Sequence, residues 1–253
     1  MKMNLKDILR NDRGKPIIGL SVYDYFGARL AEEFQEIDFV LVGDSLSMVF
    51  KGKPNVKHVT LDEMLYHLRI VKDIVTDKPI ILDMPIGTYE KMEDAYRNVY
   101  KAISDGADGV MIEGIHIETM EMLSNEGISY IVHLGYMPKY HQKPVIIKDY
   151  EKLLHESKTC QEYGANAIKF ELVDKEVTKK IREDLEIPIL GVGSGPHVDG
   201  HILVLYDFIG MYPEFKAKFV RKYVDIYRLA YDALSKLIKD IQTGDYPSEY
   251  ESY

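Results

Sequence analysis

Short apolar runs alternate along this chain with longer stretches in which apolar residues recur at helical spacing. Eight runs are rich in Val, Ile and Leu without polar alternation, which is typical of strands buried on both faces of a parallel sheet. They cover residues 16–22, 39–42, 79–82, 109–112, 129–132, 165–170, 188–192 and 203–206. The pattern therefore predicts eight strands.

Amphipathic stretches separate most of these runs and predict helices over residues 24–35, 61–75, 91–104, 117–125, 149–163 and 175–184. Thr60 and Glu63 have the spacing of a capping box at the start of the second helix. A long helix over residues 213–241 and a polar tail over 242–253 are expected to follow.

Eight β/α units in 253 residues are the size and order of a (β/α)8 TIM barrel. We expect one barrel domain over residues 1–253, ending in the long C-terminal helix. A doubly wound sheet is the alternative, but it leaves the last two apolar runs unexplained.

Composition limits the classes of binding partner and the cellular location that are expected. The net charge of -9, with acids and bases mixed along the chain, disfavours binding to nucleic acid or to a membrane surface. The N-terminus has no apolar signal-peptide core, and no apolar stretch approaches the roughly 18 residues that span a bilayer. The single cysteine, Cys160, is interpreted as a packing residue, and a cytoplasmic location is expected.

Carboxylates stand where four of the predicted strands end: Asp44, Asp83, Glu113 and Glu171. Burying an ionised carboxylate is costly unless a partner neutralises it. Because the ends of parallel strands meet at one edge, the four groups are expected to converge around a cation. Oxygen-only ligands indicate Mg²⁺ or a similar hard ion. His133 ends the fifth run in the same way.

An ordered set of motifs over residues 16–220 resembles the ketopantoate hydroxymethyltransferase family of the phosphoenolpyruvate/pyruvate superfamily. The motifs are Tyr23-Asp24, Val42-Gly43-Asp44-Ser45, Val59-Thr60 with His67, Leu82-Asp83-Met84-Pro85, Ile112-Glu113-Gly114, His133-Leu134-Gly135, Glu171, Gly191-Val192-Gly193-Ser194-Gly195 and Asp199-Gly200. Each lies near a predicted strand end.

The resemblance implies a specific activity. It implies a (β/α)8 barrel that binds Mg²⁺ and a 2-oxo acid, forms an enolate, and adds a hydroxymethyl group from methylenetetrahydrofolate. The substrate would be 3-methyl-2-oxobutanoate, in pantothenate biosynthesis. The resemblance also implies rings of identical subunits, with the C-terminal helix joining neighbours.

Site residues follow by motif match. The resemblance implies a metal site at Asp44, Asp83 and Glu113, a substrate contact at Ser45, a proton acceptor at Glu171 and a pocket histidine at His133. The first two aspartates would also face the substrate.

Each of these residues also has a structural interpretation. Asp44 could cap a turn, Asp83 could be a turn acid, and Glu113 could be a rim residue. Glu171 could form a salt bridge at the barrel mouth, His133 could be a core histidine with its hydrogen bonds satisfied, and the Ser45 hydroxyl could bond only backbone. Residues 191–195 could bind an anion, as loops after the seventh strand of barrels often do, or only shape the mouth.

Two departures from the family concern the pocket walls. Met111 stands where the family usually has a substrate-binding lysine, and Lys169 and Glu171 share one face of the sixth strand. Lys169 therefore either restores the missing cation as a substrate-binding residue or only pairs with Glu171. The segment 136–144 is shorter than the family's glycine-rich loop, and Tyr206 replaces a usual histidine.

Two competing functions remain at the level of sequence. A lyase or a phosphoenolpyruvate-mutase-like enzyme would keep the metal and the enolate but run another reaction. A catalytically lapsed homologue would have lost activity with the change to Met111.

Overall fold

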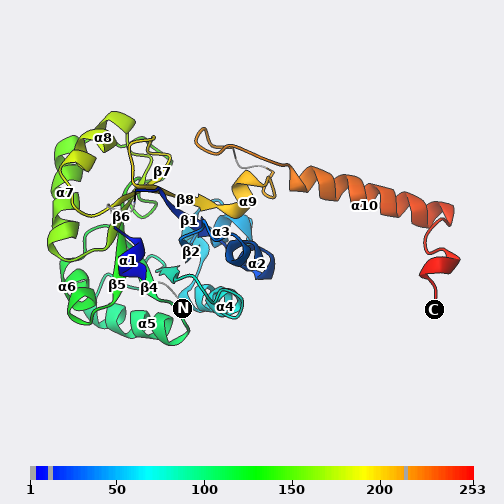
Figure 1. Ribbon diagram of the computed structural model, residues 1–253, viewed down its shortest axis with the longest axis horizontal. Coiled ribbons are helices and arrows are strands. Elements are labelled where there is room, and N and C mark those ends of the chain that lie inside the picture. Colours follow the sequence, from blue (N-terminus) through cyan, green and yellow to red (C-terminus); the bar gives the residue numbers. More distant parts are fainter. Residues whose placement is uncertain (1–3, 11–13, 214–215) are drawn as a thin grey trace. The chain divides into compact units, whose positions relative to one another are not determined.

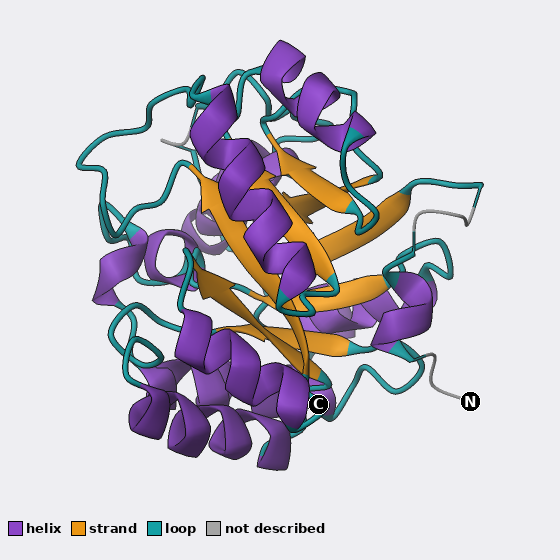
Figure 2. Cartoon of the chain, turned by 90° about the vertical axis from the view of Figure 1, so that its left-hand side faces the viewer, coloured by secondary structure: helices purple, strands orange, loops and turns teal. Residues whose placement is uncertain are grey.

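The computed structural model describes residues 4–10, 14–213 and 216–253 (Figure 1). Within these residues, eight parallel strands pair in chain order and close into a barrel, with helices around it (Figure 2). The strands are β1 (Ile17–Ser21), β2 (Phe39–Val42), β3 (Ile80–Asp83), β4 (Gly109–Glu113), β5 (Ser129–Gly135), β6 (Ala167–Glu171), β7 (Ile189–Val192) and β8 (Gly200–Val204). The predicted (β/α)8 barrel is confirmed.

The outer helices correspond to the predicted amphipathic stretches. They are α2 (Tyr25–Glu33), α4 (Leu61–Lys72), α5 (Met92–Ser104), α6 (Ile117–Asn125), α7 (Tyr150–Glu162) and α8 (Lys175–Glu183). The capping box of Thr60 and Glu63 forms at the start of α4. Three shorter elements, α1 (Leu5–Ile8), α3 (Leu46–Val49) and η1 (Val56–His58), contain too few residues to show a period in the sequence.

The last strand lies earlier in the chain than predicted. It spans Gly200–Val204, whereas residues 203–206 were expected, and the short helix α9 (Leu205–Phe208) follows at once. Gly200 passes so close to β1 that an added Cβ would lie 2.2 Å from the Ile17 carbonyl oxygen. The close approach that closes the barrel therefore falls on a glycine, where the apolar pattern is weak.

The interior of the barrel is apolar at its N-terminal end. One buried cluster joins Leu5, Ile8 and Leu9, on and just after α1, to inward side chains of the strands, among them Ile17 and Met111. Strand side chains alternate between faces, so residues two positions further along also point inward. On that basis Asp83, Glu113, His133, Lys169 and Glu171 face the interior above the apolar cluster. Cys160 is buried, as predicted for a packing residue.

Four Asx side chains fasten the N-terminal ends of the strands. Each precedes an even-numbered strand and accepts a hydrogen bond from a backbone N–H near the start of the preceding odd-numbered strand. The pairs are Asp38 with Ile18 at 2.9 Å, Asp108 with Ile80 at 2.7 Å, Asn166 with Tyr130 at 2.9 Å and Asp199 with Ile189 at 2.8 Å. We call these four contacts the Asx clamps.

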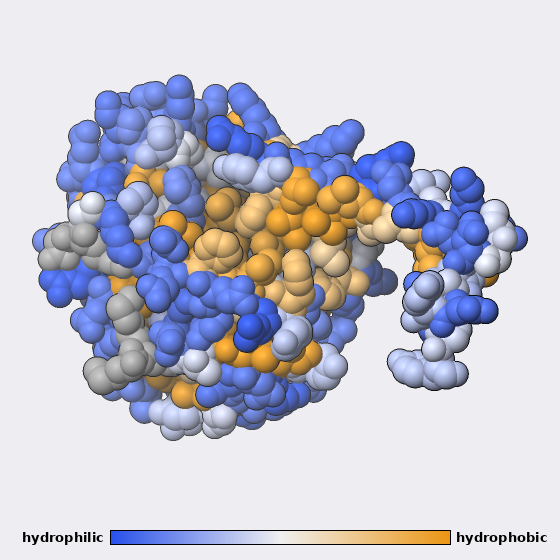
Figure 3. Space-filling model, turned by 45° about the vertical axis from the view of Figure 1, so that its right-hand side comes forward, coloured by the Kyte–Doolittle hydropathy of each residue, from blue (hydrophilic) through white to orange (hydrophobic). Residues whose placement is uncertain are grey.

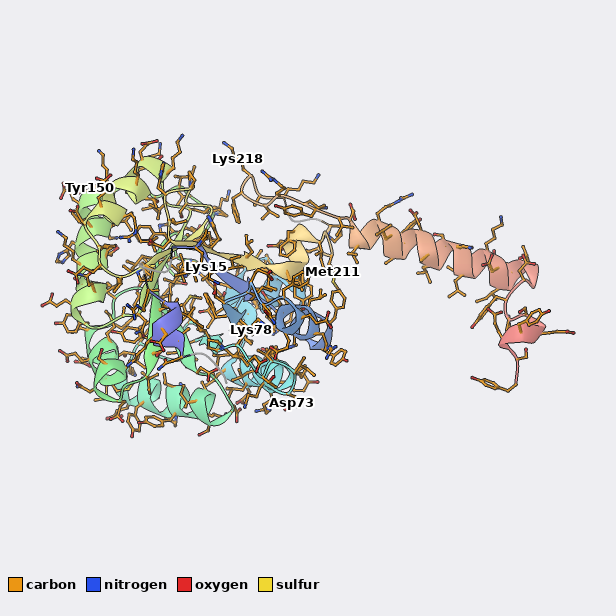
Figure 4. All side chains as sticks on the ribbon, viewed as in Figure 1. Lys15, Asp73, Lys78, Tyr150, Met211 and Lys218 are labelled. Atoms are coloured by element: carbon orange, nitrogen blue, oxygen red, sulfur yellow. The ribbon has the colours of Figure 1, made fainter. Side chains whose placement is uncertain are left out.

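Ion pairs reinforce the same end of the barrel. Lys15, labelled in Figure 4, lies 3.5 Å from Asp38, and Arg182 lies 2.6 Å from Asp199. Lys78, also labelled, is buried and donates to the Glu32 carbonyl at 2.9 Å. These contacts therefore stabilise the N-terminal end of the barrel, whereas the active sites of (β/α)8 barrels lie at the opposite, C-terminal end.

Residues 206–253 form a second compact unit, with the helices α10 (Ile226–Thr243) and η2 (Glu249–Glu251). The helix expected from residue 213 begins at Ile226, because Asp225 accepts a hydrogen bond from the Arg228 N–H and caps it. Residues 214 and 215 of the expected helix lie outside the described residues. All of α10 is described, and none of its side chains is buried.

The surface carries apolar areas among its charges. Figure 3 shows hydrophobic residues gathered on one part of the surface and hydrophilic residues over most of the rest. Exposed aromatic side chains include Tyr25 and Phe26 on α2 and Tyr66 on α4. Within the described residues, no helix has the length and apolar character that a membrane span needs.

Candidate active site

The predicted carboxylates meet at the C-terminal end of the barrel. Asp83, Glu113 and Glu171 are the last residues of β3, β4 and β6, and Asp44 lies just beyond β2. Their mutual influence shows the convergence, because Asp44 and Glu171 each raise the pKa of Glu113. The structure therefore brings together the acidic residues that the sequence singled out.

Asp44 and Asp83 are direct neighbours. The Asp44 N–H donates to Asp83 Oδ2 at 3.4 Å. Burial raises the pKa of Asp44 to about 6, although the Lys169 ammonium opposes the shift. Burial, and then the Asp44 carboxylate, hold the pKa of Asp83 well above its usual range. Two acids held in this way favour a shared cation or a shared proton.

Glu113 is tied to the segment that follows β5. Its Oε1 accepts a hydrogen bond from the Lys139 N–H at 2.9 Å. The Lys139 ammonium in turn bonds Glu90 Oε1 at 2.7 Å. Burial raises the pKa of Glu113 to about 7, and the bond from Lys139 opposes that shift. Part of the altered segment 136–144 thus forms a wall against this carboxylate.

His133, Lys169 and Glu171 form a second group beside the acidic pair. Lys169 Nζ lies 2.8 Å from Glu171 Oε2, and His133 Nε2 lies 3.3 Å from the same oxygen. Burial, with a further contribution from the Lys169 charge, holds the pKa of His133 well below its usual range. The imidazole is therefore neutral at pH 7.

Lys169 is a charged residue inside the barrel mouth. Burial disfavours its ammonium form, but the carboxylates of Glu171, Asp83 and Asp44 outweigh that effect and raise its pKa. Only 8% of the residue is exposed. A permanent cation thus faces the space between the two acidic groups.

Comparison with known proteins agrees with this geometry. The family model described as ketopantoate hydroxymethyltransferase matches residues 2–249. The chain belongs to the ketopantoate hydroxymethyltransferase family. This confirms the family and the hydroxymethyltransferase class that the motifs predicted.

Relatives in this family match along their whole length. The chain is 36% identical over 265 residues to the 3-methyl-2-oxobutanoate hydroxymethyltransferase of Aquifex aeolicus, with 100% of each chain covered. It is 35% identical over 254 residues to the enzyme of that name from Caldicellulosiruptor saccharolyticus, with 96% of each covered.

Solved structures show the same fold at low identity. A phosphonopyruvate hydrolase superposes with a TM-score of 0.66 at 14% identity, over 99% of this chain and 93% of that one. A 2,3-dimethylmalate lyase, named as a member of the PEP mutase/isocitrate lyase superfamily, superposes with a TM-score of 0.62 at 14% identity, over 98% and 90%.

The ketopantoate hydroxymethyltransferase family usually carries a lysine on β4. This chain has no charged residue at that position. Met111 is fully buried in the apolar cluster below the site. Lys169 lies on β6, and its Cα pairs in register with that of His133 on β5. The contact between Lys169 and Glu171 shows that their side chains share one face of β6, as the sequence predicted.

The donor set fits a hard divalent ion. Asp44 and Asp83 offer adjacent carboxylate oxygens. The pKa values of both carboxyl groups are raised, and a bound cation would lower them. Within the described residues, no three His, Cys, Asp or Glu side chains are arranged as a metal cage. Mg²⁺ commonly takes one or two protein carboxylates and completes its shell with substrate and water, so the pair is compatible with it.

Two features beside Glu171, a left-handed backbone and a bracing hydroxyl, were not predicted from the sequence. Leu172, directly after Glu171, has φ 50 and is the one non-glycine residue with left-handed φ among those the structure describes. Such a backbone is costly and clusters at functional sites. Ser194, in the glycine-rich loop after β7, bonds the Phe170 carbonyl at 2.8 Å and the Val173 N–H at 3.1 Å. It braces the turn that presents Glu171.

Asp24, part of the first motif, has a structural role. Its side chain accepts a hydrogen bond from the Gly27 N–H at 2.8 Å and caps α2. The adjacent Tyr23 is fully buried, and its phenol reaches Ser45.

Proposed function

We propose that this protein transfers a hydroxymethyl group to C3 of 3-methyl-2-oxobutanoate, forming ketopantoate for pantothenate biosynthesis. The observation that carries the proposal is one barrel mouth in which Glu171, paired with Lys169 and 3.3 Å from His133 Nε2, lies near the Asp44–Asp83 pair. Membership of the hydroxymethyltransferase family selects this reaction from those that such a site could run.

The acidic pair would form the metal site. Asp44 and Asp83 would hold Mg²⁺, with Glu113 as the third acid. When bound, the ion supplies Lewis acidity toward the keto oxygen of the 2-oxo acid. The other end of the substrate is an anion, and Lys169 and Ser45 would bind its carboxylate. His133, which is neutral, offers a ring nitrogen to the same pocket.

Glu171 is the proposed base. Its Oε2 would accept the proton from C3, and the electron pair of that C–H bond would form the C2–C3 double bond of the enolate. The enolate carbon would then attack a one-carbon electrophile, forming the new C–C bond. The donor proposed for this step is methylenetetrahydrofolate, whose methylene carbon would be released from both nitrogens to leave tetrahydrofolate, with water supplying the hydroxyl oxygen. Lys169 and His133 would orient Oε2 before substrate arrives.

Proton NMR of C3 exchange tests the first half of the reaction. We expect 3-methyl-2-oxobutanoate in D₂O to lose its C3 proton signal with enzyme and Mg²⁺, without any donor. Glu171→Gln should abolish exchange. Glu176→Gln, which changes an exposed carboxylate on α8, should leave exchange intact.

The outcomes separate the parts of the proposal. No exchange with this acid, but exchange with another 2-oxo acid, would overturn the substrate. No exchange with any 2-oxo acid would overturn the function. Where 3-methyl-2-oxobutanoate does exchange, adding methylenetetrahydrofolate should yield ketopantoate. Exchange without formation of ketopantoate would overturn the donor alone.

A further inference from the structure

Three hydroxyl groups form a buried chain beside the acidic pair. Ser21, the last residue of β1, donates from Oγ to Tyr23 Oη at 3.1 Å. Tyr23 Oη lies 2.5 Å from Ser45 Oγ. Ser21 and Tyr23 are buried, and Ser45 is partly exposed at the mouth. The chain therefore runs from the barrel wall to the residue that follows Asp44.

The surroundings hold this chain in place. A Cβ on Gly43 would lie 2.9 Å from Ser21 Oγ and 3.2 Å from Ser45 Oγ, so the hydroxyl groups occupy space that only glycine leaves open. The Tyr23 ring packs edge-on against Phe50 with centroids 5.6 Å apart. His67 Nδ1 lies 2.7 Å from the Tyr23 carbonyl oxygen. The phenol is thus fixed at both its ring and its backbone.

Ser45 does not have the role that its position would suggest. It is the N-cap residue of α3, where serine usually accepts a hydrogen bond from the first turn of the helix. Its side chain makes no such bond within the described residues of α3. The Ser45 Oγ instead contacts the Tyr23 phenol. Ser45 directly follows Asp44 in the chain.

The order of donors along the chain sets what Ser45 can offer to a ligand. Tyr23 Oη accepts the Ser21 proton, and in its contact with Ser45 Oγ either hydroxyl can be the donor. An anion beside Ser45 selects the arrangement in which the phenol donates. A Ser45 oxygen that accepts from Tyr23 keeps its own proton to donate elsewhere. An anionic ligand needs a donor there, because a hydroxyl lone pair would repel it.

We propose that Tyr23 is a positioning residue, which fixes the Ser45 hydroxyl as a hydrogen-bond donor toward the carboxylate of the bound 2-oxo acid. The inference rests on the proposed function, because it needs a 2-oxo acid in the barrel mouth. It assigns to Tyr23 no contact with the reacting atoms.

A double-mutant cycle tests whether Tyr23 acts through Ser45. The variants are Tyr23→Phe, Ser45→Ala and both together, and the readout is KM and kcat for C3 exchange. A lost hydrogen bond to a charged group predicts that Ser45→Ala raises KM about tenfold or more. Tyr23→Phe should raise KM severalfold with a much smaller change in kcat. The double variant should match Ser45→Ala, because the phenol then has nothing to orient.

Tyr130→Phe is the matched control. Tyr130 is also fully buried, and its hydroxyl bonds the Tyr163 carbonyl at 2.5 Å, away from the acidic groups. We expect it to lower Tm without raising KM. Ser21→Ala, which removes the donor to the phenol, should raise KM less than Tyr23→Phe and should have no effect in the Ser45→Ala background.

Additive effects of Tyr23→Phe and Ser45→Ala would overturn the positioning role while leaving the proposed function intact. So would a KM for Tyr23→Phe equal to that of Tyr130→Phe. If Tyr23→Phe does not fold, the Ser21→Ala and Ser45→Ala cycle decides the question in the same way. A wild-type enzyme without exchange on any 2-oxo acid would overturn the proposed function itself and this role with it.

Discussion

Asp44 and Glu113 occupy surroundings that disfavour their ionised forms. Burial raises their pKa values to about 6 and about 7, whereas carboxyl groups in an unfolded chain ionise near pH 4. Between those limits the folded protein binds more protons than the unfolded chain. The stability that these groups contribute is therefore full below about pH 4 and is lost as the pH rises to about 7.

This sign predicts the behaviour of the metal-free protein. In EDTA, we expect the Tm of wild type to fall relative to that of Glu113→Gln as the pH rises from about 4.5 to 7.5. Mg²⁺ should raise the wild-type Tm more at the higher pH, because its ligands are then deprotonated. Differential scanning fluorimetry measures both effects. A Tm unaffected by Mg²⁺ throughout this range would contradict the metal site.

The Lys169 side chain gives a second prediction at this scale. Lys169→Met keeps the length of the side chain and removes the cation beside Glu171. We expect the Kd of the 2-oxo acid, measured by isothermal titration calorimetry with Mg²⁺, to rise about tenfold or more. Lys152→Met, at an exposed ion pair on α7, is the control and should leave the Kd unchanged.

The alternative for Lys169 gives a different result. If Lys169 only pairs with Glu171, the Kd should stay constant while the pH dependence of C3 exchange shifts. Measuring both quantities on the same variant separates substrate binding from an effect on the base.

The sequence located the site residues better than it located their partners. An acid directly after an apolar run is visible in one dimension, so Asp83, Glu113 and Glu171 could be placed at strand ends. The bond from the Lys139 N–H to Glu113 Oε1 and the left-handed backbone of Leu172 could not be predicted, because the donor of the first and all of the second are main-chain features that the side chains of Lys139 and Leu172 do not specify.

At the scale of elements, the predicted bounds were accurate where the apolar residues recur with a clear period. The helix over Ile117–Asn125 agrees with its predicted bounds, because apolar residues recur through all its turns. The strand β8 was displaced, because Gly200 and His201 at its start interrupt the apolar pattern. The apolar residues that follow belong in part to α9, and a short apolar run does not distinguish strand from helix.

The Asx clamps supply the prediction at this scale. Asp108→Ala removes the acceptor for the Ile80 N–H and should lower the free energy of unfolding by about 1–3 kcal/mol. Asp108→Asn keeps an acceptor oxygen and should cost less. Urea denaturation measures both. Asp73→Ala, at the exposed residue labelled in Figure 4, is the control. Equal stability of Asp108→Ala and wild type would show that the clamp contributes nothing.

At the scale of the whole molecule, α10 predicts self-association. Leu234, Leu237, Ile238 and Ile241 are exposed, and among the described residues of their own unit nothing covers them. We expect another copy of the chain to cover this face, because a contiguous apolar strip on a helix is unfavourable in water. Leu234→Asp should reduce the mass measured by light scattering. Lys236→Glu, on the other side of the helix, should not, and equal masses for the two variants would contradict the prediction.

The Asx clamps also bear on the order in which the strands of the barrel can pair during folding. They join residues only 20, 28, 36 and 10 positions apart, so each closes a short loop as soon as its even-numbered strand is available. The pairing of β1 with β8, in contrast, joins Ile17 to Gly200 across most of the barrel sequence. We expect the four clamped strand pairs to form first and the β1–β8 seam to close last, because it requires the contact of longest range along the chain.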